Sequence, residues 1–210
     1  MSIIYQALLK EGKLTRKEKS LLLVGIFAAR REEREMLYFV EHAVKEGNSV
    51  AEIAELITSA IISRGIPTWL SGNEAISYAI NLSNEEIIPK MPEDKVMIFS
   101  SQQECINYYQ SEFDTLPTWI QNLIDYAPDT LLKYSNLRTT SLRNGAVSRL
   151  LKELLLYAIN VCDSYEKGIA IHKSNALSLG ANTVILEEVK ALCIYVVGIK
   201  VIWSDTEGKA

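Results

Sequence analysis

The chain has few of the residues that most often hold metals or perform redox chemistry. Its 210 residues include two histidines, His42 and His172, and three cysteines. The cysteines lie far apart and form no CxxC pair, which is typical of free thiols in a reducing compartment. We therefore expect a cytoplasmic protein without disulfides. With so few ligand residues and no glycine-rich phosphate loop, the sequence predicts no metal and no cofactor.

The chain also lacks a surplus of positive charge and a long hydrophobic run. Its formal net charge is −4, which argues against nucleic acid as the main partner because phosphate binding needs clustered Lys and Arg. The apolar run at 20–29 is too short to span a bilayer and has charged residues on both sides. We therefore expect neither a nucleic-acid nor a membrane partner.

Strand signals are scarce, and VMIF at 96–99 is the only short run of β type. Elsewhere apolar residues recur every three or four positions, as in 53–61 and 184–197, and this spacing is typical of helices. Thr15 and Asp163 each have a glutamate three residues later, the spacing of a capping box, and Ser49 precedes another apolar stretch. The sequence predicts an all-α fold.

The two halves of the chain resemble each other. Residues 39–65 align with 172–198 without a gap, so that Gly47 meets Gly180 and Gly65 meets Gly198. We interpret this as two tandem repeats of one helical unit. The predicted domains are a degenerate first repeat at 1–85, a linker at 86–113 and a better preserved second repeat at 114–206. The alternative is a general helical bundle with similar turns in both halves.

The sequence around His172 resembles the carboxymuconolactone decarboxylase and alkylhydroperoxidase D-like family. It shares a histidine followed by Ala176 and Gly180, a polar turn and an apolar helix ending in glycine. The redox branch of that family carries a glutamate, two cysteines and a histidine at fixed spacing. Counted from Glu153, those positions hold Tyr165, Gly168 and His172 here, so both cysteines are absent.

The resemblance is best over 113–206 and weaker over 14–70, where Ser20 and Phe39 stand in place of the glutamate and the histidine. It implies the alkylhydroperoxidase D-like helical bundle. It also implies a homo-oligomer, either a trimer of fused repeats in place of six single units or a dimer.

The residues themselves indicate where chemistry could occur in the second repeat. Tyr165, Gly168 and His172 are spaced to lie on one helical face, and Tyr157 and Asn160 share a face with Glu153. If the two helices pack antiparallel, Glu153 can approach His172, and a carboxylate beside an imidazole can move protons. We expect Glu153 and His172 to be catalytic, with Tyr165, Gly168, Asn160, Tyr157 and Cys162 lining the pocket. The alternative is a structural histidine and tyrosines at the edge of the core.

Three functions remain open on the sequence. The first is a small-molecule enzyme that uses Glu153 and His172 on a lactone or an organic acid. The second is a peroxide-reducing antioxidant protein that uses Cys162, predicted to lie near the start of the helix bearing His172 and to have no second cysteine nearby. The third is a non-catalytic ligand-binding or scaffold protein, in which Glu153 would be exposed and far from His172.

Overall fold

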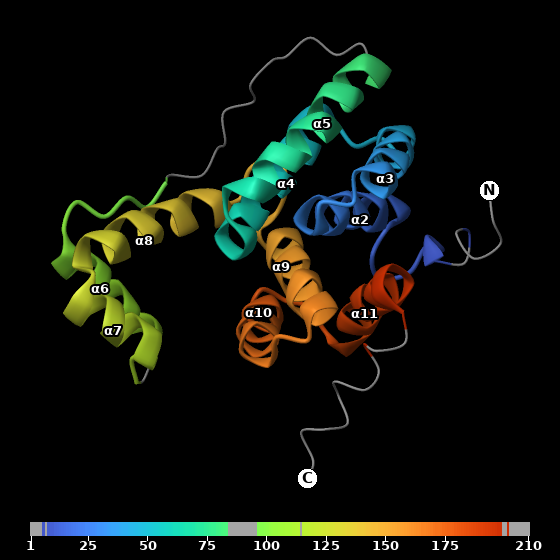
Figure 1. Ribbon diagram of the computed structural model, residues 1–210. Coiled ribbons are helices and arrows are strands. Elements are labelled where there is room, and N and C mark those ends of the chain that lie inside the picture. Colours follow the sequence, from blue (N-terminus) through green and yellow to red (C-terminus); the bar gives the residue numbers. More distant parts are fainter. Residues whose placement is uncertain (1–5, 7, 84–95, 114, 199–200, 202–210) are drawn as a thin grey trace. The chain divides into compact units, whose positions relative to one another are not determined.

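The computed structural model describes residues 6, 8–83, 96–113, 115–198 and 201 (Figure 1). These residues form helices and no strand, so the all-α prediction is confirmed. The run at 96–99 is irregular rather than a strand. No helix in the described ranges has the length and apolar character needed to cross a membrane. The helices are α2 Arg16–Arg30, α3 Glu33–Lys45, α4 Val50–Arg64, α5 Ile66–Ser83, α6 Gln102–Glu112, α7 Thr118–Tyr126, α8 Pro128–Leu142, α9 Arg149–Asp163, α10 Glu166–Ser178 and α11 Thr183–Val197.

The chain divides into two compact units. Unit 1 comprises Met1–Pro92 and Asn144–Ala210, and unit 2 comprises Glu93–Arg143. Unit 2 holds α6, α7 and α8 around a small core of Tyr109, Ile120 and Leu131. The segment 86–113, expected to be a linker, therefore contains helix α6, which packs against α8 within this unit.

The helices of unit 1 form two sets with matching bounds. Adding 133 to each residue number converts α2 into α9, α3 into α10 and α4 into α11 at both ends. The turns correspond as well, because Gly47 and Gly180 have φ angles of 88° and 97°. Only glycine adopts such angles without strain, so the same turn needs the same residue in both sets. The correspondence supports the predicted repeat.

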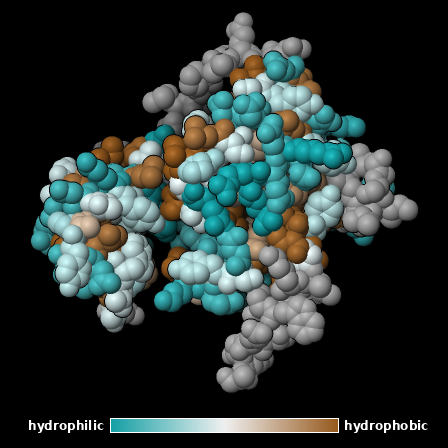
Figure 2. Space-filling model, in the orientation of Figure 1, coloured by the Kyte–Doolittle hydropathy of each residue, from teal (hydrophilic) through white to brown (hydrophobic). Residues whose placement is uncertain are grey.

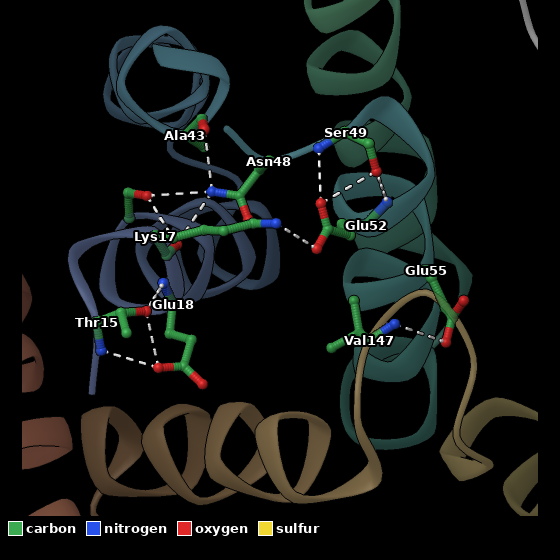
Figure 3. Close-up of polar contacts among 10 residues, drawn as sticks. Thr15, Lys17, Glu18, Ala43, Asn48, Ser49, Glu52, Glu55 and Val147 are labelled. Carbon is green, nitrogen blue, oxygen red and sulfur yellow. Dashed lines mark hydrogen bonds and ion pairs between the residues drawn. The ribbon is translucent and has the colours of Figure 1, made fainter. Parts of the chain in front are cut away.

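The helix starts follow the sequence signals in two of three places. Thr15 caps α2 and Ser49 caps α4, each in a capping box with the glutamate three residues later (Figure 3). The box expected at Asp163 is wrong. Asp163 is the last residue of α9, and Tyr165 precedes α10 without a side-chain cap. The chain turns at Ser164, whose φ is 57°, and this turn separates the two helices.

Glu55 on α4 anchors the loop that precedes α9. Its carboxylate accepts a hydrogen bond from the backbone amide of Ala146 at 2.7 Å. It accepts another from the amide of Val147 at 3.4 Å (Figure 3). It also forms an ion pair with Lys152 at 2.5 Å, and the Lys152 side chain is only 1% exposed. A buried ammonium is costly without such a counter-charge. Glu55 therefore fixes the start of α9, the helix that carries Glu153.

Glu188 on α11 makes the corresponding contacts from the second helix set to the start of the first. It accepts hydrogen bonds from the amides of Lys13 at 2.7 Å and Leu14 at 3.1 Å and pairs with Lys19 at 2.9 Å. Each partner is 133 positions from its counterpart around Glu55. Each helix set thus holds the loop before the first helix of the other set.

Helix α9 lies at the centre of these contacts. It packs against α2, α4, α10 and α11, and it runs beside α10 and α11 in Figure 1. All of its residues from Leu151 to Cys162 are buried, including the polar Glu153 and Asn160. A helix covered on every side leaves its polar side chains dependent on hydrogen-bond partners within the protein.

Candidate functional site

The structure brings Glu153 and His172 into direct contact. Glu153 projects from the first half of α9 and His172 from the middle of α10. His172 Nδ1 and Glu153 Oε2 are joined by a hydrogen bond of 2.8 Å. Glu153 is 0% exposed and His172 is 7% exposed. The approach of the two side chains that the sequence spacing suggested is therefore present in the fold.

Asn175, one turn after His172 on α10, adds a second contact to the carboxylate. Its Nδ2 donates to Glu153 Oε2 at 3.2 Å. Asn175 was not among the site residues predicted from the sequence. The available signal was its position three residues after His172, which places both side chains on adjacent parts of one helix face.

This hydrogen bond assigns different roles to the two ring nitrogens of His172. An ionised carboxylate only accepts hydrogen bonds, so Nδ1 carries the proton and, in the neutral ring, Nε2 carries a lone pair. Within the described part of the chain, Nε2 has no hydrogen-bond partner. A histidine oriented in this way by a carboxylate can take a proton at Nε2, and the carboxylate stabilises the imidazolium that forms.

Asn160 occupies the space beside Gly168. The Asn160 side chain is buried, and its Nδ2 donates to the Leu156 carbonyl at 2.7 Å. A Cβ added at Gly168 would lie 2.1 Å from Asn160 Oδ1, so a larger residue requires the amide or the helices to shift. The room that the small residue provides on α10 is filled by α9, so Gly168 serves helix packing.

The two tyrosines predicted as pocket lining lie in different surroundings. Tyr157 is 1% exposed and belongs to the core along α9. Tyr165 precedes α10 and is 55% exposed. Tyr165 therefore does not share the buried surroundings of Glu153.

Cys162 does not lie at the position predicted from the sequence. It is in the last turn of α9, not at the start of α10, and it is 1% exposed. The carbonyl end of a helix disfavours a thiolate, so the predicted help from a helix N-terminus is absent. The expectation that no second cysteine lies nearby is also wrong. A hydrogen bond with Cys162, together with burial, raises the pKa of Cys193 well above its ordinary value.

The corresponding place in the first helix set is filled by structural contacts. Ser20 stands 133 residues before Glu153, and the side-chain amide of Asn48 donates to Ser20 Oγ at 3.3 Å. The same amide donates to the Ala43 carbonyl at 3.0 Å (Figure 3). Phe39 stands 133 residues before His172 and stacks on Phe27 with ring centroids 5.4 Å apart. These positions lack an ionisable pair, as the sequence predicts.

Among the residues that the structure describes, no three His, Cys, Asp or Glu side chains are grouped as metal ligands.

Comparison with known proteins agrees with this fold. Residues 1–77 match the model of the carboxymuconolactone decarboxylase family. A crystal structure of a candidate gamma-carboxymuconolactone decarboxylase subunit from Burkholderia xenovorans LB400 superposes with a TM-score of 0.61 at 18% identity. The superposition covers 98% of this chain and 84% of that one. No curated protein matches the chain. The resemblance inferred from the sequence is thus confirmed.

The family match falls on the first helix set. Residues 1–77 span α2 to most of α5 and include neither Glu153 nor His172. The stronger resemblance was expected at 113–206. The segment that matches the family model and the candidate catalytic residues therefore lie in different parts of the chain.

Proposed function

We propose that this protein is a carboxymuconolactone decarboxylase-like enzyme that acts on a lactone or a small organic acid, with Glu153 and His172 as its proton-transfer pair. The observation that carries the proposal is the buried 2.8 Å hydrogen bond between Glu153 Oε2 and His172 Nδ1. A buried carboxylate and imidazole in contact are typical of acid–base sites. The family match at 1–77 supports the likeness from which the ligand class is taken.

In this proposal His172 Nε2 removes a proton from the carbon beside a ligand carbonyl group. Glu153 remains ionised and holds the imidazolium in place. The electron pair left on the ligand is delocalised into the carbonyl as an enolate. His172 then returns the proton, either to the same carbon or to another carbon over which the electron pair is delocalised. The first outcome is exchange, the second isomerises the ligand, and both restore the neutral ring.

The two other functions have less support. A peroxide reductase needs an accessible thiolate, whereas Cys162 and Cys193 are buried and the pKa of Cys193 is raised. The scaffold hypothesis required an exposed Glu153 remote from His172, and Glu153 is 0% exposed. The buried pair therefore favours the enzyme.

We further propose a cytoplasmic homo-oligomer with a small-molecule ligand. The three described cysteines are free thiols, as a reducing compartment favours. Apolar side chains of α10 reach the surface at Ile171 and Leu177, and hydrophobic residues also appear between hydrophilic ones on the face in Figure 2. Such side chains are suited to contact a second subunit. Light scattering of the purified protein measures the number of subunits, and a monomer would contradict this part of the proposal.

The enzyme proposal is tested by incubation with lactones and small organic acids in D2O. Proton NMR follows both their consumption and the incorporation of deuterium at carbon. We expect one ligand class to exchange or react, and Glu153→Gln to lower the rate by about 10² to 10⁴, the usual contribution of acid–base catalysis. Neither exchange nor reaction with any compound, or full activity of a folded Glu153→Gln variant, would contradict it.

A further inference from the structure

A pocket of about 410 Å³ lies at the ends of several helices of unit 1. Its lining includes the last residues of α2 and α4, the first turn of α5 and the end of α9. Three arginines contribute to it, Arg30, Arg31 and Arg64, against one carboxylate, Asp163. The hydroxyl-bearing residues Ser63 and Thr68 also line it. This density of guanidinium groups contrasts with the overall formal charge of −4.

The ion pairs around the pocket leave one positive charge in excess. Arg64 pairs with Asp163, and Arg30 pairs with Glu32 at 2.7 Å. Arg31, which ends α2 with a φ angle of 60°, has no ion-pair partner within the described ranges. An incoming anion would therefore meet a guanidinium group that is not already neutralised.

The surroundings of Arg64 indicate that these cations affect one another. Burial lowers the pKa of its guanidinium from the ordinary value, and the charges of Arg30 and Arg31 lower it further. Arg64 remains charged at neutral pH, because arginine titrates far above it. Like charges held together in a partly buried pocket favour the binding of an anion, which offsets their repulsion.

The arginines of the pocket have no counterparts in the second helix set. The positions 133 residues after Arg31 and Arg64 hold Ser164 and Val197. The corresponding turns of the second helix set therefore form without these charges. Arginine at the end of a helix can stabilise the free carbonyls, but the second set shows that these turns do not require it.

We propose that this pocket binds the carboxylate or phosphate group of a small molecule. Guanidinium groups present paired N–H donors that match the two oxygens of such groups, and Ser63 and Thr68 add hydroxyl donors. The pocket is separate from the proposed proton-transfer pair. Asp163 follows Glu153 by ten residues in α9, about 15 Å along the helix axis at the usual rise per residue.

The test is calorimetric titration of the full-length protein with inorganic phosphate and, separately, with succinate. The two titrations distinguish a phosphate ligand from a carboxylate ligand. We expect saturable binding of at least one anion and an affinity at least about tenfold lower in Arg31→Gln, since one charge-assisted contact is lost. Arg31 has no ion-pair partner in the described structure, so this substitution leaves the other pairs intact.

Two controls make the result specific. Arg34→Gln removes an exposed arginine that does not line the pocket and should bind as the unmodified protein does. Glu153→Gln should also bind normally, because the pocket does not depend on the proton-transfer site. No saturable binding of either anion up to about 10 mM, or equal affinity in Arg31→Gln and the unmodified protein, would overturn the proposal.

Discussion

At the residue scale, the burial of Glu153 defines the candidate site. A carboxylate removed from water needs hydrogen bonds within the protein, and His172 and Asn175 supply them from one face of α10. The same contacts orient the imidazole. Both contacts end on Oε2, so the hydrogen bonds that stabilise this oxygen also orient the base.

Gly168 gives a residue-scale prediction about how α9 and α10 pack. Gly168→Ala places a Cβ 2.1 Å from Asn160 Oδ1, so the helices or the amide must shift. We expect a loss of about 1–3 kcal/mol in the free energy of unfolding, opposite to the usual gain of a Gly→Ala change in a helix. Urea denaturation measures the difference.

The control for that prediction is Ser174→Ala, an exposed substitution on the same helix. It should change the free energy of unfolding by less than about 0.5 kcal/mol. A second substitution, Asn160→Ala, should partly restore stability in the Gly168→Ala background. If Gly168→Ala is as stable as the unmodified protein, the close packing described here is incorrect.

At the element scale, Glu55 and Glu188 position the two helix sets, because each holds the loop and the first helix of the other set through backbone hydrogen bonds and a lysine ion pair. We call these two groups of contacts clamps. The contacts of Glu188 predict a dependence on pH. Burial alone would raise the pKa of Glu188, but its contacts with Lys19 and with the amides of Lys13 and Leu14 lower the pKa below its ordinary value of 4.5. A carboxylate with a lowered folded-state pKa stabilises the fold above pH 4.5, and this stabilisation is lost as the pH falls through the folded-state value.

Glu188→Gln should therefore lower the free energy of unfolding at pH 7 by about 1.5–3 kcal/mol, the range for hydrogen bonds to charged groups. The difference from the unmodified protein should shrink below pH 4.5. Glu187→Gln on the same helix is the control, because its carboxylate is 61% exposed and its loss should matter little. A difference that stays constant from pH 7 to pH 3 would contradict this account.

The sequence predicts the elements better than the contacts between them. The glycine pairs placed the repeat in register, and the capping signals at Thr15 and Ser49 mark helix starts because capping is local. The Asp163 signal failed because the chain turns at Ser164 before α10 begins. The clamps of Glu55 and Glu188 depend on packing across more than 90 positions, as in Glu55 to Ala146, and have no local signal.

For the candidate site too, the sequence predicts a contact between consecutive helices but not the contacts between helices far apart in the chain. The spacing of Glu153 and His172 suggested their approach, because both lie on adjacent helices joined by a short turn. The contact of Cys162 with Cys193 was missed, since it joins non-consecutive helices α9 and α11. The arginine pocket was missed for the same reason, because four helix ends form it. In the sequence, Arg30 and Arg31 are followed by several glutamates, and such a mixture of charges is typical of a solvent-exposed helix face.

At the scale of the whole molecule, the chain combines two units with very different cores. Unit 2 has a small cluster around Tyr109, Ile120 and Leu131, whereas unit 1 buries whole helices such as α9. Small cores provide little stability. We expect unit 2 to unfold at a lower urea concentration than unit 1.

Tryptophan fluorescence separates the two transitions. Trp119 lies in α7 of unit 2, so a variant with Trp69→Phe and Trp203→Phe reports on that unit alone. Its fluorescence midpoint should precede the midpoint of circular dichroism, which reports mostly on unit 1. Coincident midpoints would show that the units unfold together and would contradict the expectation.

The central claim is that His172 is the proton-transfer residue of an enzyme. Its most direct test compares His172→Ala with His42→Ala in turnover of the lactone or organic acid that the unmodified protein converts. His42 is the other histidine of the chain and lies in the first helix set. We predict that His172→Ala folds but loses turnover by about 10² or more, whereas His42→Ala retains it. Unchanged turnover in a folded His172→Ala variant would contradict the account.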